Sequence, residues 1–519
     1  MRAVSRARSW WGWGYADAAL PAAELAGTVR DTLGFGGDRT EDPVPLEAVE
    51  LPPPRLLLPE PLRELGSTGS LDRVSCSTGQ AYRDVVRSLR GRVDHPTDVV
   101  VRPRTERDVS DVLEWAAAVN AAVIPHGGGT SVVGGIEPRV PDGFDGVVTL
   151  DLRGMASVLE VDPVSLAARV QAGASGPELE RQLAEHGLTA RFYPQSFEFS
   201  TVGGWIATRA GGHFATVETH VDDLVESVRA ISYAGVWDSR RLPASGAGPS
   251  PDGLLLGSEG TLGVITSAWL RVRPRPRCRA SRAVWFPSWR AGVDAVRDLV
   301  QSGLAPSNLR LVDSGEAART AGGDGQRCVL LLGFESSDEP VEERLAAGLR
   351  RAGGRGGAWE PSESGSAADS WRSSFLAMPY LRDALVRLGV LVETFETAVT
   401  WDRFGALHES VTAAVHDALS EPCHVSCRIT HAYPDGAAPY FTVLAPVRRG
   451  AELETWDRVK QVAVSAVLAA GGTVTHHHAV GRDHLDGYRR QRPEPFAAAL
   501  HAAKSALDPD HRLNPLCLL

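Results

Sequence analysis

Residues 193–212 read YPQSFEFSTVGGWIATRAGG, and the glycines of this stretch restrict the fold. One pair, Gly203 and Gly204, lies in its middle, and a second pair, Gly211 and Gly212, closes it. Clustered glycines let backbone N–H groups converge on an anion, because no Cβ blocks the approach. The stretch therefore predicts a loop of small residues that lies against a ligand.

Two further loops of small residues flank this one in the chain. Residues 125–131 read PHGGGTS, and residues 257–265 read GSEGTLGVI. The first is not a Walker A loop, because Gly135 stands where the lysine belongs, and it is not a GxGxxG turn, because Val132 replaces the third glycine. Alone, it fits a flexible turn equally well. Together, the three loops indicate a long, phosphate-containing ligand, and a dinucleotide meets that description.

The surrounding sequence alternates short strands and helices. The β-branched residues 99–101 precede Pro103, which predicts a strand, and apolar residues at 109–117 recur at helical spacing. A second helix is expected at about 174–187, with Gly187 as its C-cap, and the Pro- and Arg-rich residues 271–279 read as a linker. Further strands are expected at 147–152, 168–172 and 228–233.

Composition and charge exclude several classes of protein. At 519 residues, 43% hydrophobic and 23% charged, the chain can form two or three domains with sizeable cores. The net charge of -10 argues against nucleic-acid binding, and no apolar run approaches the roughly 18 residues that span a bilayer. The six cysteines are too sparse for a disulfide scaffold, so we expect reduced thiols in a cytoplasmic protein.

The first 17 residues, MRAVSRARSWWGWGYAD, combine arginines with tryptophans. The segment lacks the apolar core and cleavage pattern of a secretory signal. Two alternatives remain at this point. The arginines and tryptophans could touch an anionic membrane surface, which would make the protein membrane-peripheral, or the segment could be an ordered arm packed on a domain.

The motifs PHGGGTS, STVGGW, ATRAGG and GSEGTLGVIT, in this order and spacing, resemble the vanillyl-alcohol-oxidase-type flavoproteins. Together with WGWGYAD, PYLRD, ETFETAVTWDR, CRITHAY and THHHAVG, they resemble the alkyldihydroxyacetonephosphate synthase family over nearly the whole chain. The resemblance implies an α+β fold: a PCMH-type FAD-binding domain of two α+β subdomains, an α+β substrate (cap) domain and a C-terminal helical tail. The implied parts are an N-terminal arm and preface (1–91), the FAD-binding domain (92–274), the cap domain (275–470) and the active-site segment with the tail (471–519).

The resemblance also implies which residues contact FAD. We expect non-covalent FAD, because His126 precedes a glycine pair, whereas the usual linking histidine follows one, and no cysteine lies near that loop. The implied FAD contacts are Pro125, His126, Gly127, Gly128, Gly129, Thr130, Ser131, Pro194, Gln195, Ser196, Phe197, Glu198, Phe199, Ser200, Ala207, Thr208, Arg209, Ala210, Glu259, Gly260, Thr261, Leu262, Gly263, Val264 and Ile265.

The implied activity is the exchange of the acyl group of acyl-dihydroxyacetone phosphate for a long-chain fatty alcohol, in ether-lipid synthesis. It would proceed through a flavin N5 adduct without net oxidation, in a protein that we expect to be a homodimer. Arg382 and Arg310 match the family's phosphate-binding and active-site arginines. A guanidinium forks onto phosphate oxygens, although Arg382 could instead pair with the neighbouring Asp383.

Tyr440 matches the family's catalytic tyrosine, and His476, His477 and His478 follow it in the chain. A phenol has a reference pKa near ~10, so it needs cationic neighbours to act as a base, which the histidines could supply. If the segment is extended, His476 and His478 share one face, toward the flavin. A core position is the alternative for a buried histidine.

Two other functions remain as alternatives. Related flavin dehydrogenases oxidise 2-hydroxy acids such as D-lactate or glycolate, and some use a metal. Here His431 remains from their metal-binding loop, but Tyr440 stands at the second histidine and His477 at the glutamate, so we expect no metal. A flavin-free binding protein is the third possibility, and the intact loops argue against it.

Overall fold

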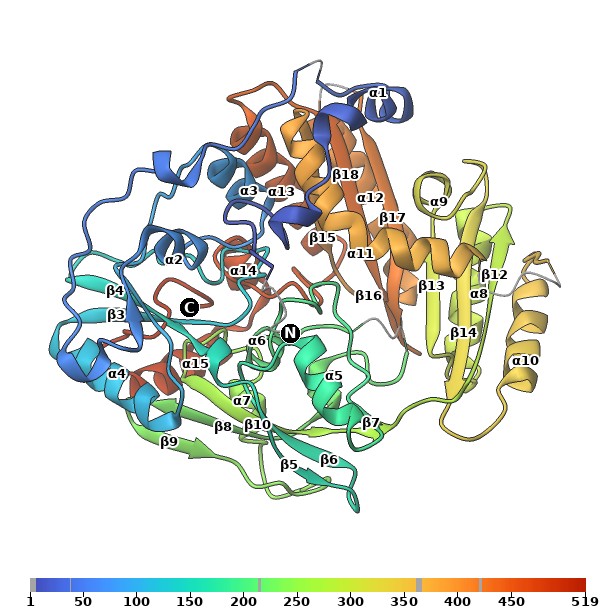
Figure 1. The fold of residues 1–519 in the computed structure, drawn as a ribbon. Coiled ribbons are helices and arrows are strands. Elements are labelled where there is room, and N and C mark those ends of the chain that lie inside the picture. Colours follow the sequence, from blue (N-terminus) through green and yellow to red (C-terminus); the bar gives the residue numbers. More distant parts are fainter. Residues whose placement is uncertain (1–5, 38, 213–215, 361–365, 420–421) are drawn as a thin grey trace.

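Two sheets formed within residues 66–271 and a third formed within 278–446 organise the chain (Figure 1). The computed structural model describes residues 6–37, 39–212, 216–360, 366–419 and 422–519. The fold is α+β, as predicted.

The first sheet has three parallel strands and one short antiparallel edge strand. Helix α4 (Glu106–Ala118) covers it, and its N-terminus is fixed by Thr105, whose hydroxyl accepts a hydrogen bond from the Asp108 N–H. The strand and helix predicted between residues 99 and 117 are thus present. In spatial order the strands are β1 (Gly66–Ser67), β2 (Val99–Val101), β4 (Gly146–Asp151) and β3 (Ala121–His126).

The second sheet is antiparallel, and α5 (Gly176–Ala184) and α6 (Val202–Thr208) pack into its core. Helix α5 ends three residues before Gly187, contrary to prediction, because Gly187 lies in the turn that follows, with φ +71°. The expected linker at 271–279 is also wrong in part, since β11 (Arg273–Pro274) pairs there with β7 (Leu188–Thr189). In spatial order the strands are β5 (Val158–Asp162), β6 (Ala167–Gln171), β10 (Val264–Arg271), β8 (Val225–Ser232) and β9 (Gly235–Asp238).

The third sheet is antiparallel, and its helices enclose a large core. Its strands, in spatial order, are β12 (Cys278–Phe286), β14 (Cys328–Ser336), β13 (Asn308–Val312), β17 (His424–Ala432), β18 (Gly436–Pro446) and β15 (Val390–Glu396), and β16 (Val399–Thr400) pairs with β18. The helices are α8 (Trp289–Gln301), α9 (Ser314–Thr320), α10 (Glu342–Gly353), α11 (Ser366–Arg387), α12 (Trp401–Ala418) and α13 (Glu452–Ala469).

The N-terminal region, predicted to be an arm and preface, contains three α-helices among its described residues. Helix α1 (Ala22–Leu33) packs against α11 through shared apolar residues, and α2 (Ser70–Ser75) and α3 (Tyr82–Leu89) follow it. The remaining short elements are α7 (Asp252–Leu255) and 3-10 helices at Ala16–Ala18, Leu46–Ala48, Glu60–Leu62, Leu152–Gly154 and Val221–Asp223.

The C-terminal tail returns to the first sheet, as α14 (Leu485–Gln491), α15 (Glu494–Leu507) and a following stretch of turns that forms an isolated bridge between Leu513 and Val123. Val123 of the edge strand β3 donates its N–H to the carbonyl of Arg512 at 2.8 Å and accepts the N–H of Asn514 at 2.9 Å. Leu513 is buried in the same core as β3. The last residues of the chain therefore complete the first sheet.

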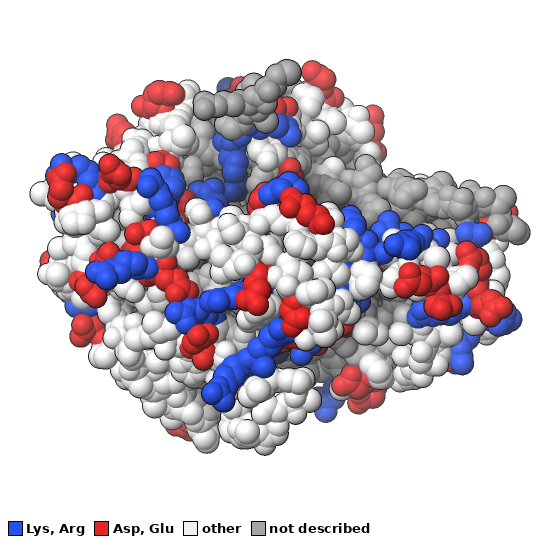
Figure 2. All heavy atoms as spheres, turned by 60° about the horizontal axis from the view of Figure 1, so that its bottom comes forward, with Lys and Arg blue, Asp and Glu red and all other residues white. Residues whose placement is uncertain are grey.

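Charged side chains of both signs are interspersed on the face shown in Figure 2. Among the described residues, no helix combines the length and apolar composition needed to cross a bilayer. All six cysteines are free thiols, as expected.

Candidate active site

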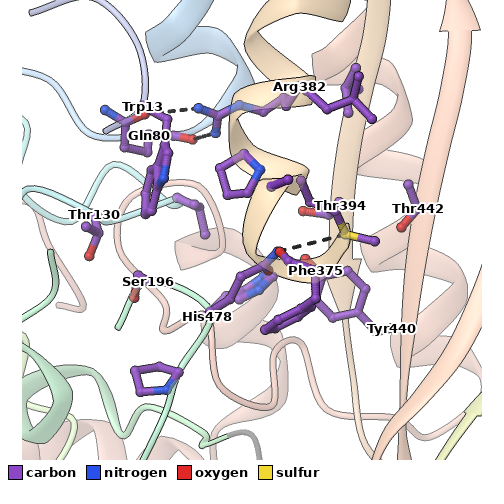
Figure 3. Close-up of a pocket in the computed structure, with 18 of the residues that line it drawn as sticks. Trp13, Gln80, Thr130, Ser196, Phe375, Arg382, Thr394, Tyr440, Thr442 and His478 are labelled. Carbon is purple, nitrogen blue, oxygen red and sulfur yellow. Dashed lines mark hydrogen bonds between the residues drawn. The ribbon is translucent and has the colours of Figure 1, made fainter. Parts of the chain in front are cut away.

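A cavity of about 770 Å³ lies between the glycine loops and the third sheet. Figure 3 shows Thr130 and Ser196 of these loops on one side and Thr394, Tyr440 and Thr442 of the sheet on the other. Helix α1, helix α11 and the histidine segment complete the walls. The cavity therefore joins segments far apart in the sequence.

The glycine loop at 127–131 is shaped to bring backbone against a ligand. A Cβ on Gly128 would collide with the carbonyl oxygen of Phe199, and one on Gly127 would collide with the Thr201 hydroxyl. These contacts exclude any side chain at the two positions. The predicted FAD contacts that line the cavity are Gly127, Gly128, Gly129, Thr130, Ser131, Pro194, Gln195, Ser196, Ser200, Thr208 and Ala210.

The other predicted FAD contacts lie outside the cavity lining: Pro125, His126, Phe197, Glu198, Phe199, Ala207, Arg209 and residues 259–265. Leu262, Val264 and Ile265 are core residues. The Glu259 carboxylate accepts the N–H groups of Val480 at 2.9 Å and Gly481 at 2.8 Å. In this structure the third loop therefore holds the end of the histidine segment.

His126 lies beside the glycine loop, and its ring nitrogens could form hydrogen bonds that the described residues do not provide. Its ring is buried, and within the described chain neither ring nitrogen has a well-formed hydrogen-bond partner. Burial lowers the pKa of His126 to about 4, so the ring is neutral. A buried polar group without partners is costly. The glycine cradle lines the cavity and fits FAD, whereas His126 lies behind that lining.

The N-terminal arm packs across the cavity, which agrees with the ordered-arm alternative. Arg8 donates a hydrogen bond to the Gly128 carbonyl at 2.9 Å, and Trp13 packs edge-on against Phe199 with ring centroids 5.5 Å apart. The Trp13 N–H donates to the Asp383 carboxylate of α11. The arm therefore connects the glycine loop with the third sheet's helices.

One wall of the cavity is apolar. Helix α1, helix α11, β15 and β18 form a separate hydrophobic cluster, and many of its members also line the cavity. The members common to both are Leu20, Leu25, Val29, Leu33, Leu385, Val392 and Leu444. This wall suits a long hydrocarbon chain.

Arginines line the cavity beside the apolar wall. Arg310 of β13 and Arg428 of β17 are both buried, and Arg428 pairs with Glu316 at 2.7 Å. Burial and the neighbouring Arg428 lower the pKa of Arg310 to about 9. The positive charges of Arg310 and Arg428 repel each other, and an anion bound in the cavity would offset that repulsion.

Arg382 also lines the cavity, and its guanidinium is engaged (Figure 3). It donates to the Gln80 carbonyl at 2.6 Å, to the Gln80 side chain at 3.0 Å and to Asp383 at 2.7 Å. The alternative pairing with Asp383 is therefore present. The guanidinium is held in place, and its N–H groups already donate to three acceptors on two residues.

Tyr440 lies within the third sheet, between its cross-strand neighbours Glu396 and Arg428. Its side chain is 5% exposed, and burial raises its pKa. The Cζ of Arg428 lies 3.9 Å from the ring centroid and opposes that rise. At neutral pH the Tyr440 hydroxyl therefore keeps its proton.

The histidine triplet forms a tight turn around Glu396, and the prediction of an extended segment is wrong. The carboxylate accepts the N–H groups of His476 at 2.6 Å, His477 at 3.0 Å and His478 at 2.9 Å. Successive N–H groups can converge on one carboxylate only when the backbone curls. Consequently His477 and His478 line the cavity and His476 lies behind them, whereas extended geometry would pair His476 with His478.

The histidines are neutral, so they do not supply the positive charge that we predicted. Burial lowers the pKa of His476 and His477 well below the usual value and lowers that of His478 as well. The cation beside Tyr440 is instead Arg428.

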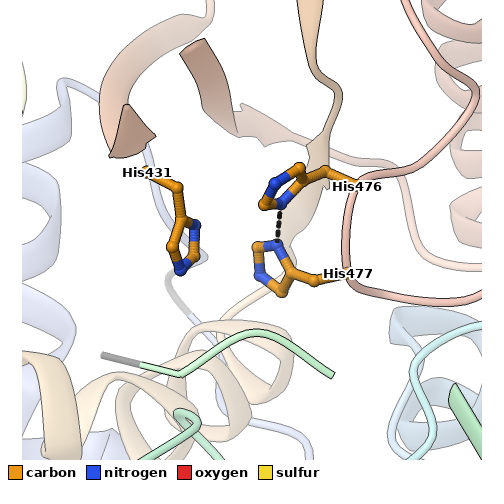
Figure 4. Close-up of side chains that lie close together, drawn as sticks. All are labelled: His431, His476 and His477. Carbon is orange, nitrogen blue, oxygen red and sulfur yellow. Dashed lines mark hydrogen bonds between the residues drawn. The ribbon is translucent and has the colours of Figure 1, made fainter. Parts of the chain in front are cut away.

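Two of these rings meet a fourth histidine, from β17 (Figure 4). A register shift in β17 lies between Ile429 and His431, and His431 faces His476 and His477. Ring nitrogens of the three lie within 4.8 Å of one another, a spacing that could hold a metal ion. In this structure they form hydrogen bonds: the Nδ1 atoms of His476 and His477 are 2.9 Å apart, and His431 Nε2 is 2.7 Å from the Gly212 carbonyl.

Sequence reasoning missed Glu396, Arg428, His220 and Tyr433 as parts of this site. Glu396 lies within the motif ETFETAVTWDR, and Arg428 and Tyr433 lie within CRITHAY, which were usable signals. His220 lies outside the quoted motifs and joins the site through its contact with His476.

Comparison with known proteins agrees with this architecture. Residues 97–237 match the FAD binding domain model, and residues 275–517 match the model for FAD linked oxidases, C-terminal domain. A solved structure of p-cresol methylhydroxylase, 14% identical, covers 87% of this chain and 93% of its own, with TM-score 0.67. The two family models thus define an FAD-linked enzyme, and the solved structure shares its fold.

Two further similarities are more specific. A solved structure of alkyldihydroxyacetonephosphate synthase, 24% identical, covers 98% of both chains with TM-score 0.81. The alkyldihydroxyacetonephosphate synthase of Caenorhabditis elegans is 31% identical, over 83% of this chain and 77% of that protein. The chain belongs to the alkyldihydroxyacetonephosphate synthase family.

Proposed function

We propose that this enzyme exchanges the acyl group of acyl-dihydroxyacetone phosphate for a long-chain fatty alcohol. The bond between carbon 1 and the ester oxygen breaks, and the fatty acid leaves as a carboxylate. The alcohol oxygen forms the new bond to carbon 1 and releases its proton, so there is no net oxidation. The observation that carries the proposal is one cavity lined by glycine loops, arginines and an apolar wall.

The apolar wall supports the two chain-bearing substrates. The acyl chain that leaves and the alkyl chain that enters have the same character, so one compartment between α1 and α11 can serve both in turn. Burying each methylene contributes about 0.8 kcal/mol. A long chain would therefore bind there in preference to a short one.

The arginines support recognition of the phosphate. A phosphate dianion beside Arg310 would offset the repulsion between Arg310 and Arg428. Arg382 would offer its fork from α11, oriented by Gln80 and Asp383. Two cations from different elements would fix the reacting carbon relative to the histidine segment.

The neutral histidines and the protonated tyrosine support opposite proton-transfer roles. A neutral imidazole has one bare nitrogen, so His477 or His478 can accept the proton removed at carbon 1. Tyr440 keeps its hydroxyl proton and can donate a hydrogen bond to developing negative charge. Arg428 behind the ring favours that role.

FAD, when bound, would supply the electrophile that carries the three-carbon unit between the two half-reactions. Residues 127–131 and 194–196 would hold it. We propose non-covalent binding, because His126 lies outside the cavity lining and the described lining contains no cysteine.

The test is an exchange assay. Purified flavin-loaded protein is incubated with acyl-dihydroxyacetone phosphate and isotope-labelled hexadecanol. We expect labelled alkyl-dihydroxyacetone phosphate and free fatty acid in equal amounts, with no net reduction of the flavin once the exchange is complete. A protein that forms no ether, but whose flavin is reduced by D-lactate or glycolate, would be a 2-hydroxy acid dehydrogenase instead.

A further inference from the structure

We propose that His220 is a positioning residue that fixes the tautomer of His477 and so leaves the Nε2 of His477 as a proton acceptor. This inference deepens the proposed function, since it concerns the proton acceptor of the same site. His220 lies between α6 and β8, outside the histidine triplet, and reaches His477 through His476.

The contacts form a continuous chain of four groups. His220 Nδ1 lies 3.2 Å from the Arg209 carbonyl oxygen, and His220 Nε2 lies 3.0 Å from His476 Nε2. His476 Nδ1 lies 2.9 Å from His477 Nδ1. Each contact is within hydrogen-bonding distance, and each needs one donor and one acceptor.

The carbonyl end of the chain decides the direction of every bond. A carbonyl oxygen only accepts, so His220 Nδ1 carries the proton. Because burial lowers the pKa of His220, its ring is neutral and its Nε2 is bare. That bare nitrogen accepts the proton that His476 carries on Nε2.

The same reasoning continues to the cavity. His476 is neutral with its proton on Nε2, so its Nδ1 is bare and accepts from His477 Nδ1. His477 then has its proton on Nδ1, and its Nε2 is bare. A carboxylate oxygen of Glu396, 3.5 Å from His477 Nδ1, independently favours a proton at that nitrogen.

Tyr433 is the reason that loss of His220 would change the tautomer of His476 and His477. Its hydroxyl lies 2.7 Å from His476 Nε2 and 3.0 Å from the Thr219 hydroxyl. With His220 present, the single Nε2 proton of His476 is shared between His220 Nε2 and the Tyr433 oxygen, and Tyr433 donates to Thr219. Without His220, Tyr433 can donate to His476 Nε2, which would reverse both remaining bonds and move the His477 proton to Nε2.

The consequence for function is specific. An Nε2 that already carries a proton has no lone pair left to accept another, whereas a bare Nε2 does. His220 would therefore set whether His477, which lines the cavity, acts as acceptor or donor. A residue without contact to substrate would control the direction of proton transfer.

The test reads the tautomer directly. Flavin-loaded protein labelled with ¹⁵N in the histidine rings is measured by NMR, where protonated and bare ring nitrogens have different shifts. The His477→Gln spectrum assigns the His477 signals. We expect a proton on Nδ1 of His477 in the unaltered protein and in His220→Gln, whose amide oxygen still accepts, and a proton on Nε2 in His220→Leu.

Activity gives a second measurement. We expect His220→Leu to lower kcat on the order of 10²-fold, the scale of one proton-transfer group, with KM nearly unchanged and activity largely retained in His220→Gln. His501→Leu, at an exposed position of α15, is the control, and melting temperatures verify that each variant folds. A proton on Nε2 of His477 in the unaltered protein, an unchanged tautomer in His220→Leu, or zinc bound stoichiometrically by these rings would overturn the proposal. The tautomer measurement needs no substrate, so a failed exchange assay alone would overturn the proposed reaction and not this assignment.

Discussion

The Glu396 carboxylate accepts a hydrogen bond from the backbone N–H of His478 at 2.9 Å, although 82 residues separate them. The same carboxylate accepts the N–H groups of His476 and His477 and the hydroxyl proton of Thr475. Glu396 is 2% exposed and ends strand β15. One buried acid at the end of a strand thus sets the shape of the whole histidine segment.

Replacing Glu396 with glutamine should damage that shape. The amide keeps the size of the carboxylate but turns one acceptor into a donor that faces N–H groups. We expect a loss of about 1–3 kcal/mol in unfolding free energy, with most activity lost and the flavin retained. Denaturant unfolding and flavin absorbance measure the two effects. Glu409→Gln in α12, where no comparable set of contacts is involved, is the comparison, and equal stability of both variants would contradict the assigned role.

The same carboxylate predicts a pH dependence of stability. Burial opposes the ionisation of Glu396, but the hydrogen bonds that it accepts from three backbone N–H groups and from Thr475 hold its pKa below the ordinary value of 4.5. A carboxyl whose pKa is depressed in the folded state stabilises the protein above the unfolded pKa and loses that contribution as the pH falls. Stability should therefore decline between about pH 4.5 and about pH 2, with a smaller decline in Glu396→Gln, as measured by unfolding at stepped pH.

A single methyl group at Gly128 should be enough to remove the cofactor. In Gly128→Ala the Cβ would collide with the Phe199 carbonyl, so the loop must move away from the cavity. We expect protein with little bound flavin, measured by visible absorbance after gel filtration. Gly405→Ala has open space around it in α12 and should retain flavin and fold normally. Full flavin content in Gly128→Ala would show that this loop does not hold the cofactor.

Tyr440→Phe should separate chemistry from binding. The variant keeps the ring beside Arg428 and loses only the hydroxyl, so fold and flavin content should be unchanged. We expect turnover to fall by ~10²-fold or more, as for other proton-transfer groups. Tyr488→Phe on α14, away from the cavity, provides the control. Turnover within a few-fold of the unaltered protein would remove Tyr440 from the mechanism.

Arg382→Lys should weaken phosphate recognition without loss of flavin. Lysine keeps the charge but cannot fork onto two oxygens or hold Gln80 and Asp383 together. Since hydrogen bonds to charged groups contribute about 1.5–3 kcal/mol, we expect kcat/KM for the acyl substrate to fall at least about tenfold. Arg290→Lys, exposed on α8, is the matched control. Unaltered kinetics in Arg382→Lys would indicate that Arg310, and not Arg382, binds the phosphate.

Chelators should leave activity unchanged. His431, His476 and His477 are close enough to hold a metal ion, but in this structure each ring already has hydrogen-bond partners. We expect elemental analysis to find substoichiometric zinc, manganese and iron, and dialysis against EDTA to preserve the exchange reaction. Loss of activity on dialysis, restored by one of these ions, would instead assign the cluster as a catalytic metal site.

The local parts of the fold were predictable from the sequence. Structure that depends on neighbouring residues in the chain appears as expected. The strand at 99–101, the helix over 109–117 and the glycine loop at 127–129 are all present. The extended form of residues 476–478 was wrong, because their backbone follows the distant Glu396. A pattern of neighbouring residues cannot predict a hydrogen-bond partner that is distant in the chain.

The charge of the site could not be predicted from the sequence either. Whether a histidine is protonated at neutral pH depends on how deeply it is buried. The burial of His476 and His477 depends on β17 and on the loop that carries His220. The positive charge beside Tyr440 belongs to Arg428, which the sheet register places directly across from it. Cross-strand neighbours become known only once the pairing of β17 and β18 is known.

The pairing of Val123 with the stretch around Leu513 has a consequence for biosynthesis. A ribosome makes β3 long before it makes the stretch around Leu513. Until that stretch emerges, one edge of the first sheet offers unpaired N–H and C=O groups to any other chain. The nascent protein therefore needs that stretch, or a chaperone in its place, to avoid aggregating through β3.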